Sequence, residues 1–433
     1  MDRRTRGIGL LVAAVALLIG TLAIGAATAP QIGGAGTSKA TETLVGSQGG
    51  DGGYHADGNV FLLEGKARVW NENNADSYFD VSPREDGTVL AAFMRDGYES
   101  GCDPYPAPCT KTGFRVIDPD ADGGPAVTTE YAFPVRSKTD SEVHDVEELS
   151  PGEFLVADMD RERVVVIEDG AEKWTWNASS FYDPPADPTR RDWLHINDVD
   201  AVDDDRYLLS VRNANQLLVV KRGQGVVEVI NADDGGNDGS CQVLDSELID
   251  SDDDGDIRCG DPATLDHQHN PQWLDEGAVL VADSGNDRII ELHRNETTGK
   301  WEPAWTLERA ERLDLQWPRD ADRLANGNTL VTDTRNSRLL EVAPNGTVVW
   351  SHRTPGIPYE AERVPDGEHV GGERYGGGAD DPGQDVPLLS AGRIVVHSLY
   401  PATPYWFVER HLAGVLVALL MATAGCAEWY RSR

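Results

Sequence analysis

Short runs of apolar, mostly β-branched residues recur along most of the chain, separated by Gly, Asn, Asp and Pro. The clearest runs lie at 154–158, 207–211, 278–283 and 328–333, and each is followed after a turn by a second apolar run. A looser copy lies at 80–92 and a last fragment at 392–397. This alternation is typical of strands and hairpins.

The runs repeat with a long period. Leu149, Leu274 and Leu324 occupy the same place in three copies, and the last two are 50 residues apart (324 − 274). An all-β repeat of this length is typical of a β-propeller with four strands in each blade. A β-solenoid has a shorter repeat, and a two-sheet sandwich would not recur in this way. The fold class predicted is therefore all-β, with about six blades between residues 58 and 400. The tryptophans that follow several copies are expected on outer strands: Trp174, Trp305 and Trp350.

Both ends of the chain carry an apolar segment. A basic start, residues 1–6, precedes an apolar run from Gly7 to Ala27, and a second run extends from Leu412 to Ala427. We expect a signal anchor or signal peptide over 1–29, a flexible tether rich in Gly, Ser and Thr over 30–54, the propeller over 55–402, and a C-terminal transmembrane helix with a short cytoplasmic tail over 403–433. Because positive residues lie at both extreme ends, the propeller is expected outside the cell, held at the cell membrane by the terminal helices.

Net charge and cysteines agree with an exported domain. The formal net charge of −36 makes nucleic acid a poor partner and is typical of a salt-adapted, halophilic surface. Cys102 and Cys109 are close neighbours, as are Cys241 and Cys259, so we expect two local disulfides. The fifth cysteine, Cys426, lies in the C-terminal apolar run.

Several polar residues share one place in the repeat. His144, His269 and Arg319 lie five residues before the aligned leucines, and Asn197 lies five before Val202, with His195 two residues further back. Equivalent positions of a propeller form a ring around its axis. Arg212 is placed by the same alignment at the end of a strand, where the other copies have Asp158, Asp283 and Asp333. We therefore expect His144, His195, Arg212, His269 and Arg319 to form an anion site in the central channel.

The same residues resemble a known family, the arylsulfate sulfotransferases built as six-bladed propellers. The matching segments are Val143–Asp145, the stretch Asp192–Asn197 followed by Arg212, and the pair Gln268–His269. The resemblance covers roughly residues 55 to 400. It implies transfer of a sulfuryl group from an aryl sulfate to a phenolic acceptor, without a nucleotide donor and through a covalent sulfohistidine.

The resemblance also implies roles for single residues. His269 would be the nucleophile, His195 and Arg212 would hold the sulfuryl oxygens, and His144 would bind the sulfuryl group or assist proton transfer at the phenol oxygen. Arg319, Asn197 and His267 are the further residues expected to bind substrate. No cofactor is required for this chemistry, since neutral imidazole is a competent nucleophile and cationic donors stabilise the transferring group. The chain departs from the bacterial enzymes in lacking their additional N-terminal β domain and in having an apolar segment at each end.

An acidic loop suggests a structural calcium ion. The interval from Val202 to Leu274 is 72 residues (274 − 202), longer than the next by about one hairpin. The additional piece has the oxygen-ligand spacing of a calcium loop, with Gly255 at the turn. The ligands would be Asp250, Asp252, Asp254, Asp256 and Asp261.

Two other functions fit a propeller. A non-catalytic extracellular propeller could bind a partner or a glycan through its blade loops, and it would not need a histidine at the channel beside Gln268. A quinone- or metal-dependent enzyme would need carboxylates on the axis, where the repeat register provides His and Arg instead.

Overall fold

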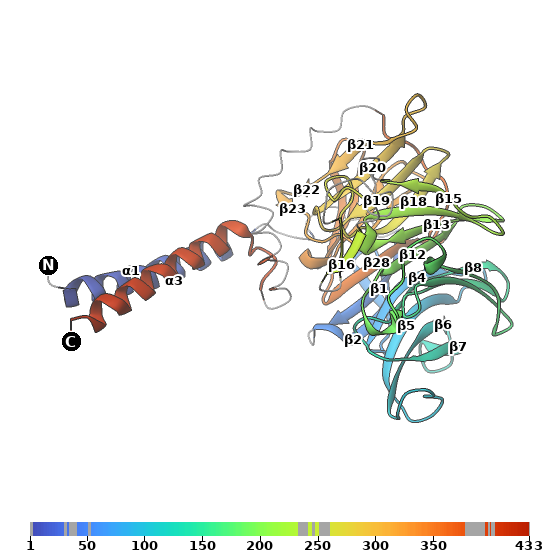
Figure 1. The fold of residues 1–433 in the computed structure, drawn as a ribbon, viewed down its shortest axis with the longest axis horizontal. Coiled ribbons are helices and arrows are strands. Elements are labelled where there is room, and N and C mark those ends of the chain that lie inside the picture. The colour runs from blue at the N-terminus through green and yellow to red at the C-terminus, as the bar shows by residue number, and fades with distance from the viewer. Residues whose placement is uncertain are drawn as a thin grey trace. The chain divides into compact units, whose positions relative to one another are not determined.

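The computed structural model describes residues 3–29, 33, 41–50, 53–232, 241–244, 247–250, 260–376, 395–396, 399 and 403–432. It contains two compact units, one of residues 32–380 and one of residues 1–31 and 381–433. The first unit is a six-bladed β-propeller, and the second holds two long apolar helices (Figure 1). The predicted fold class is confirmed.

Every blade is a four-stranded antiparallel sheet, and five of the six follow the chain from the innermost strand outward. Blade 2 contains β4 (Ser77–Pro83), β5 (Val89–Tyr98), β6 (Cys109–Asp118) and β7 (Ala126–Val135). Blade 3 contains β8 (Val143–Ser150), β9 (Glu153–Asp158), β10 (Arg163–Glu168) and β11 (Ala171–Asn177). Blade 4 contains β12 (Ile196–Ala201), β13 (Arg206–Val211), β14 (Gln216–Lys221) and β15 (Gly225–Ile230). Blade 5 contains β18 (His269–Asp275), β19 (Ala278–Asp283), β20 (Arg288–Arg294) and β21 (Trp301–Leu307). Blade 6 contains β24 (Asp320–Arg323), β25 (Thr329–Asp333), β26 (Arg338–Val342) and β27 (Val348–Arg353).

Blade 1 closes the ring with strands from both ends of the propeller. Its order is β28 (Ile357–Val364), β1 (Glu42–Gly50), β2 (Gly53–Glu64) and β3 (Ala67–Glu72), and β28 lies beside β1 in Figure 1. Val45 of β1 is paired with Ala361 of β28. One expectation is therefore corrected, since the tether expected over 30–54 contains β1. The last inner strand is β28, which precedes the repeat fragment noted at 392–397. β28 was not predicted because it is not followed by a turn and a second apolar run, as the other inner strands are.

Apolar residues of neighbouring blades fill the space between the sheets. One cluster joins Val164 and Trp176 of blade 3 to Leu209 and Leu218 of blade 4, all of them buried. Burying one such aliphatic side chain stabilises the fold by about 1.5–3 kcal/mol. The tryptophans predicted on outer strands are found there: Trp174 in β11, Trp305 in β21 and Trp350 in β27.

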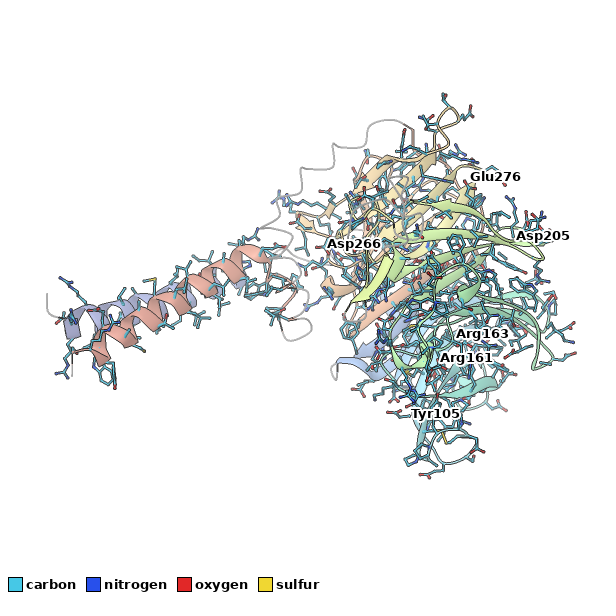
Figure 2. All side chains as sticks on the ribbon, in the orientation of Figure 1. Tyr105, Arg161, Arg163, Asp205, Asp266 and Glu276 are labelled. Carbon is cyan, nitrogen blue, oxygen red and sulfur yellow. A yellow bond between two sulfur atoms is a disulfide. The ribbon has the colours of Figure 1, made fainter. Side chains whose placement is uncertain are left out.

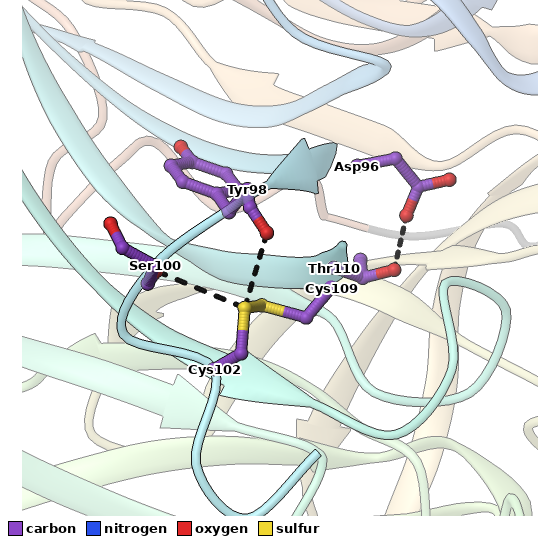
Figure 3. Close-up of a disulfide and its surroundings, with 6 residues drawn as sticks. All are labelled: Asp96, Tyr98, Ser100, Cys102, Cys109 and Thr110. Carbon is purple, nitrogen blue, oxygen red and sulfur yellow. Dashed lines mark hydrogen bonds between the residues drawn. A yellow bond between two sulfur atoms is a disulfide. The ribbon is translucent and has the colours of Figure 1, made fainter. Parts of the chain in front are cut away.

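Two further hairpins and one disulfide lie outside the blade pattern. β16 (Cys241–Leu244) pairs with β17 (Glu247–Asp250), which confirms the additional hairpin expected before blade 5, and β22 (Arg309–Ala310) pairs with β23 (Leu313–Asp314). Cys102, in the loop after β5, and Cys109, the first residue of β6, form the predicted disulfide (Figure 3). The second predicted disulfide, Cys241–Cys259, and the calcium ligands from 250 to 256 involve side chains outside the described residues. Cys426 is a free, exposed cysteine.

The second unit contains α1 (Arg3–Ala27) and α3 (Glu409–Tyr430), which run side by side (Figure 1). Both are long and apolar enough to cross a membrane by length and composition. Glycines bring the two backbones together, since a Cβ on Gly7 would lie 2.8 Å from the Gly425 carbonyl oxygen. Close approach through small residues is typical of helix pairs in membranes.

Candidate active site

Six residues at one register position form a ring at one end of the innermost strands. Neighbouring inner strands contact one another around the axis, so residues in the same register face the same region. The ring residues, one from each blade in order, are Tyr359, Phe79, His144, Asn197, His269 and Arg319. Figure 2 labels Asp266, which precedes β18, on the side of the propeller opposite Asp205 and Glu276, which lie at the far ends of inner strands. The ring therefore marks one face of the propeller.

The aromatic side chain of Tyr359 contacts three of the predicted site residues in this ring. Its aromatic ring stacks on the imidazole of His144, with centroids 5.4 Å apart, and lies edge-on to His269 at 6.0 Å. The guanidinium of Arg319 lies 5.1 Å from the centroid of the same ring, a cation–π distance. Three of the predicted site residues, from blades 3, 5 and 6, thus meet on one aromatic side chain of blade 1.

His195 and Arg212 join the ring from blade 4. The imidazole of His195 stacks on that of His144 at 5.1 Å, and its Nδ1 lies 2.8 Å from Nη1 of Arg212. The same Nδ1 lies 2.7 Å from Oδ1 of Asp192, the first residue of the sequence motif. Because Nδ1 either donates or accepts, only one of the two approaches is a hydrogen bond in a given tautomer. All five residues predicted to form the anion site are therefore brought together.

The hydrogen bonds of His269 identify its protonated nitrogen. Nδ1 lies 3.0 Å from the carbonyl oxygen of His267 and 2.8 Å from Oγ of Ser284. A carbonyl oxygen can only accept, and the Ser284 hydroxyl itself donates to the Pro318 carbonyl at 2.6 Å. The proton is therefore on Nδ1, and Nε2 of the neutral ring carries the lone pair.

Burial and neighbouring positive charge keep the histidines neutral. Burial, followed by Arg319 and Arg212, lowers the pKa of His269 well below its usual value. Burial and Arg212 lower the pKa of His195 to about 4. Burial alone would raise the pKa of Asp192, but His195 and Arg212 outweigh it and lower that pKa to about 2. An ionised Asp192 thus faces the neutral imidazole of His195 and the guanidinium of Arg212.

A second repeat register positions the residues just before the ring. His195, His267 and Trp317 each lie two residues before a ring residue and have φ values of 55°, 48° and 50°. Left-handed backbone is costly for such residues unless neighbouring groups hold it. Each of their N–H groups donates to a side chain from the preceding blade: Glu162 at 2.7 Å, Asn215 at 3.1 Å and Asp287 at 2.8 Å, respectively. His267 is therefore the counterpart of His195 in the next blade, a relationship that the alignment on leucines did not reveal.

Arg212 occupies a different register from the one expected. Asp158, Asp283 and Asp333 lie opposite Arg163, Arg288 and Arg338 and pair with them as ions. In blade 4 the corresponding pair is Val211 and Gln216, so Arg212 lies one residue beyond the aspartate position. Ser284 follows Asp283 in the same way in blade 5. These two equivalent residues contact the site histidines His195 and His269.

His144 is buried with no hydrogen bond to either ring nitrogen from the part of the chain that the structure describes. Nε of Arg212 and of Arg319 and the hydroxyl of Tyr359 also have no partner among the described residues. Buried polar groups are normally satisfied, and those that are not are concentrated at functional sites. These atoms are available to a polar ligand.

The side-chain amides of Asn197 and Gln268 hydrogen-bond to backbone carbonyls and are not directed at a ligand in the channel. The Asn197 amide donates to the Gln268 carbonyl at 2.9 Å, and the Gln268 amide donates to the Gln216 carbonyl at 3.0 Å. Both side chains therefore fix the residue before His269 against blade 4. His267 contributes its carbonyl to His269, while its imidazole lies 2.7 Å from Asp266 Oδ1.

Of the proposed calcium ligands, only the side chain of Asp261 lies among the described residues, and it accepts the N–H of Ala263 at 2.9 Å. The calcium prediction stays a prediction. The expectation that the axis offers His and Arg rather than carboxylates is corrected, because Asp80, Asp145 and Asp198 follow ring residues and are buried. The structure also adds Tyr359, Ser284 and Glu162 to the site. Each of these three residues occupies a position that recurs in other blades, and the positions could be recognised only once β28 was known to be the inner strand of blade 1.

Comparisons with solved structures give distant likenesses. A protein of unknown function from Bacteroides caccae is 12% identical over 75% of this chain and 99% of its own, with a TM-score of 0.49. A periplasmic gluconolactonase from Pseudomonas aeruginosa is 16% identical over 75% of this chain and 85% of its own, with a TM-score of 0.42. The search of curated proteins finds no match.

The family comparison matches the segment that carries the site motifs. The model described as Arylsulfotransferase (ASST) matches residues 138–300, which include His144, His195, Arg212 and His269. The resemblance inferred from those motifs, to the arylsulfotransferase family, is thereby confirmed over this segment.

Proposed function

We propose that this chain transfers a sulfuryl group from an aryl sulfate to a phenol through a covalent intermediate on Nε2 of His269. The family match supports arylsulfotransferase activity. The observation that carries the finer proposal is the tautomer of His269. Its Nδ1 proton is held by Ser284 and the His267 carbonyl, so the free lone pair lies on Nε2.

In the first half-reaction, Nε2 of His269 bonds to sulfur while the bond between sulfur and the aryl oxygen breaks. The aryl oxygen leaves with the electron pair as a phenolate. The imidazole becomes a cation that carries the sulfuryl group, and the Nδ1 proton stays with Ser284 and the His267 carbonyl. Fixing that proton lowers the reorganisation that accompanies the attack.

Arg212, His195 and Arg319 supply the positive charge that the sulfuryl oxygens need. Charge in such a transfer spreads over the equatorial oxygens, so cationic donors provide most of the stabilisation. An arriving sulfate ester brings negative charge to His195, which raises its pKa and favours the form with two N–H groups. One N–H then donates to Asp192, which lies 2.7 Å away, and the other is free for a sulfuryl oxygen.

His144 is the acid and base at the phenol oxygen. Both its nitrogens are buried without partners among the described residues, and it stacks between His195 and Tyr359. The negative charge of the bound sulfate ester raises the pKa of His144, so the imidazole takes up a proton from water as the donor binds and passes it to the leaving phenolate, which returns His144 to the neutral form. In the second half-reaction it removes the proton of the acceptor phenol, whose oxygen bonds to sulfur while the bond from Nε2 to sulfur breaks.

The propeller works outside the cell in this proposal, held at the cell membrane by α1 and α3. The support is the apolar character of the two helices, the basic residues at both ends of the chain and the Cys102–Cys109 disulfide. A disulfide of this kind persists in oxidising compartments.

The test uses the full chain in detergent with a chromogenic aryl sulfate. Wild type incubated with donor alone should gain the mass of one sulfuryl group, and added phenol should remove it. His269→Ala should show neither the adduct nor donor cleavage. His293→Gln is the matched control, because it removes a histidine of β20 that pairs with Glu291 outside the site. Donor cleavage that survives in His269→Ala would overturn the assignment.

A further inference from the structure

We propose that the axial channel of the propeller binds a Ca²⁺ ion between Glu368 and the inner-strand carboxylates Asp80, Asp145, Glu147 and Asp200. These five groups are called the channel carboxylates below. The site is distinct from the ring of histidines and arginines and from the acidic loop near residue 255. It does not depend on the proposed function.

The channel carboxylates come from a repeat register of their own. Asp80 and Asp145 each follow a ring residue directly, and Glu147 and Asp200 lie three positions after one. Positions one and three residues along a strand project from the same face, so both sets line the channel. Glu368 reaches this group from the segment that follows β28.

Structural hydrogen bonds account for only part of this arrangement. Oδ2 of Asp145 accepts the N–H of Val199 at 2.7 Å, and Oε2 of Glu147 accepts that of Ala201 at 2.7 Å. In this way an acid on one inner strand ties the next blade to it. Joining two blades in this way uses only one oxygen of each acid, and it does not require several carboxylates close together.

Two of the remaining oxygens are left without partners among the described residues. Oδ2 of Asp80 and Oδ2 of Asp200 have no hydrogen bond from the described residues, although the side chains are only 0% and 4% exposed. No ion pair with Lys, Arg or His involves a channel carboxylate in the described part of the chain. Carboxylates crowded together in this way are neutralised by protons or by a cation, and oxygens without a hydrogen-bond donor are open to a cation.

Their spacing fits Ca²⁺. Ligand oxygens of Asp80, Asp145 and Glu368 lie within 4.8 Å of one another, and so do those of Glu147, Asp200 and Glu368. Calcium binds oxygens at about 2.3–2.6 Å, so oxygens on opposite sides of the ion are roughly 5 Å apart. An all-carboxylate set without His or Cys favours Ca²⁺ over zinc or copper, and its irregular geometry favours Ca²⁺ over Mg²⁺.

A surface pocket gives the ion a way in. A pocket of about 840 Å³ is lined by Glu147 and Glu368, together with the acids Glu85, Asp203 and Asp204 and the bases Arg84 and Arg222. Acidic walls raise the local concentration of cations. Two members of the triad of Glu147, Asp200 and Glu368 line this pocket, Glu147 and Glu368, and Glu368 is shared with the group of Asp80 and Asp145.

The test measures thermal unfolding of the full chain in detergent after treatment with EGTA, at constant ionic strength. CaCl2 should raise the Tm by several degrees and MgCl2 at the same concentration by much less. Glu368→Gln and Asp80→Asn should lose this calcium response. Both should unfold at a higher Tm than wild type in EGTA, because each removes a buried like charge. A lost response therefore cannot be attributed to a variant that fails to fold.

Two controls separate other sources of calcium binding. Glu296→Gln removes an exposed charge on a distant hairpin and should keep the full response. The double variant Asp252→Asn, Asp254→Asn removes ligands of the acidic loop and should also keep it. A wild type with no calcium-specific rise in Tm, or a rise that survives in Glu368→Gln and disappears in the loop variant, would overturn the proposal.

Discussion

Oγ of Ser284 lies 2.8 Å from Nδ1 of His269 and donates its own proton to the Pro318 carbonyl. The hydroxyl is thereby oriented as an acceptor, and it holds the histidine with Nε2 free. Ser284→Ala should lower kcat for donor cleavage roughly fivefold, the worth of one hydrogen bond of about 1 kcal/mol, and leave KM nearly unchanged. Steady-state kinetics with an aryl sulfate measure both.

Ser284→Thr is the matched control. Thr334 occupies the same register in blade 6 and is buried there, so this position of a blade accommodates a threonine. The Thr variant should keep most of the wild-type kcat because its hydroxyl can still accept from Nδ1. Equal losses in the two variants would show that packing, and not the hydrogen bond, is what Ser284 contributes.

The activity should persist to unusually low pH for a histidine nucleophile. Burial and then Arg319 lower the pKa of His269 below the ordinary 6.5, and a lowered pKa keeps the ring neutral as the pH falls. The acid limb of kcat/KM should therefore lie below pH 6.5. Arg319→Leu removes a positive neighbour, which raises the pKa of His269 and should move that limb to higher pH. Arg319→Lys keeps the charge and should leave it in place.

Most of the site could be predicted from the repeat register. The residues that could not be predicted depend on how strands from the two ends of the propeller close the ring. His144, His195, Arg212 and His269 could be identified because each recurs or matches a motif. Tyr359 could not, because its strand pairs with β1, more than 300 residues earlier in the chain, and no local pattern shows such a pairing. The same gap concealed the channel carboxylates, since Asp80 and Asp145 look like solvated acids in so acidic a sequence. Arg212 was placed one residue off because the short helical turn after β13 is not visible as a change in hydrophobic pattern.

The carboxylate of Glu162 should control how firmly the His195 loop is held. It accepts the N–H groups of Leu194 at 2.8 Å, His195 at 2.7 Å and Ile196 at 3.0 Å. Glu162→Ala leaves these N–H groups without their acceptor and should lower the free energy of unfolding by about 1–3 kcal/mol. KM for the aryl sulfate should rise as well, since His195 loses its fixed position. Denaturant unfolding and steady-state kinetics test the two effects separately.

Asp287→Ala is the comparison, because Asp287 holds the N–H of Trp317 in the equivalent place one blade further on. It should cost stability to a similar degree and raise KM less, since Trp317 is not a proposed sulfuryl ligand. If KM is unchanged in Glu162→Ala, the hydrogen bonds accepted by Glu162 stabilise the fold but do not position His195 for the substrate.

The contact between Gly7 and Gly425 gives a direct test of the helix pair. A Cβ on Gly7 would lie 2.8 Å from the Gly425 carbonyl oxygen, and a Cβ on Gly425 would lie 2.9 Å from the Gly7 carbonyl oxygen. Cysteines at both positions, in a chain with Cys426→Ser, require the two helices to move apart slightly, and the thiols should then form a disulfide within one chain on oxidation. Electrophoresis without reductant should show a single faster-migrating monomer. Gly20→Cys paired with Gly425→Cys is the control, because no atom of a neighbouring residue lies within 4 Å of a Cβ at Gly20. Dimers without the faster monomer would mean that α1 and α3 pair between chains, which would contradict their pairing within one chain.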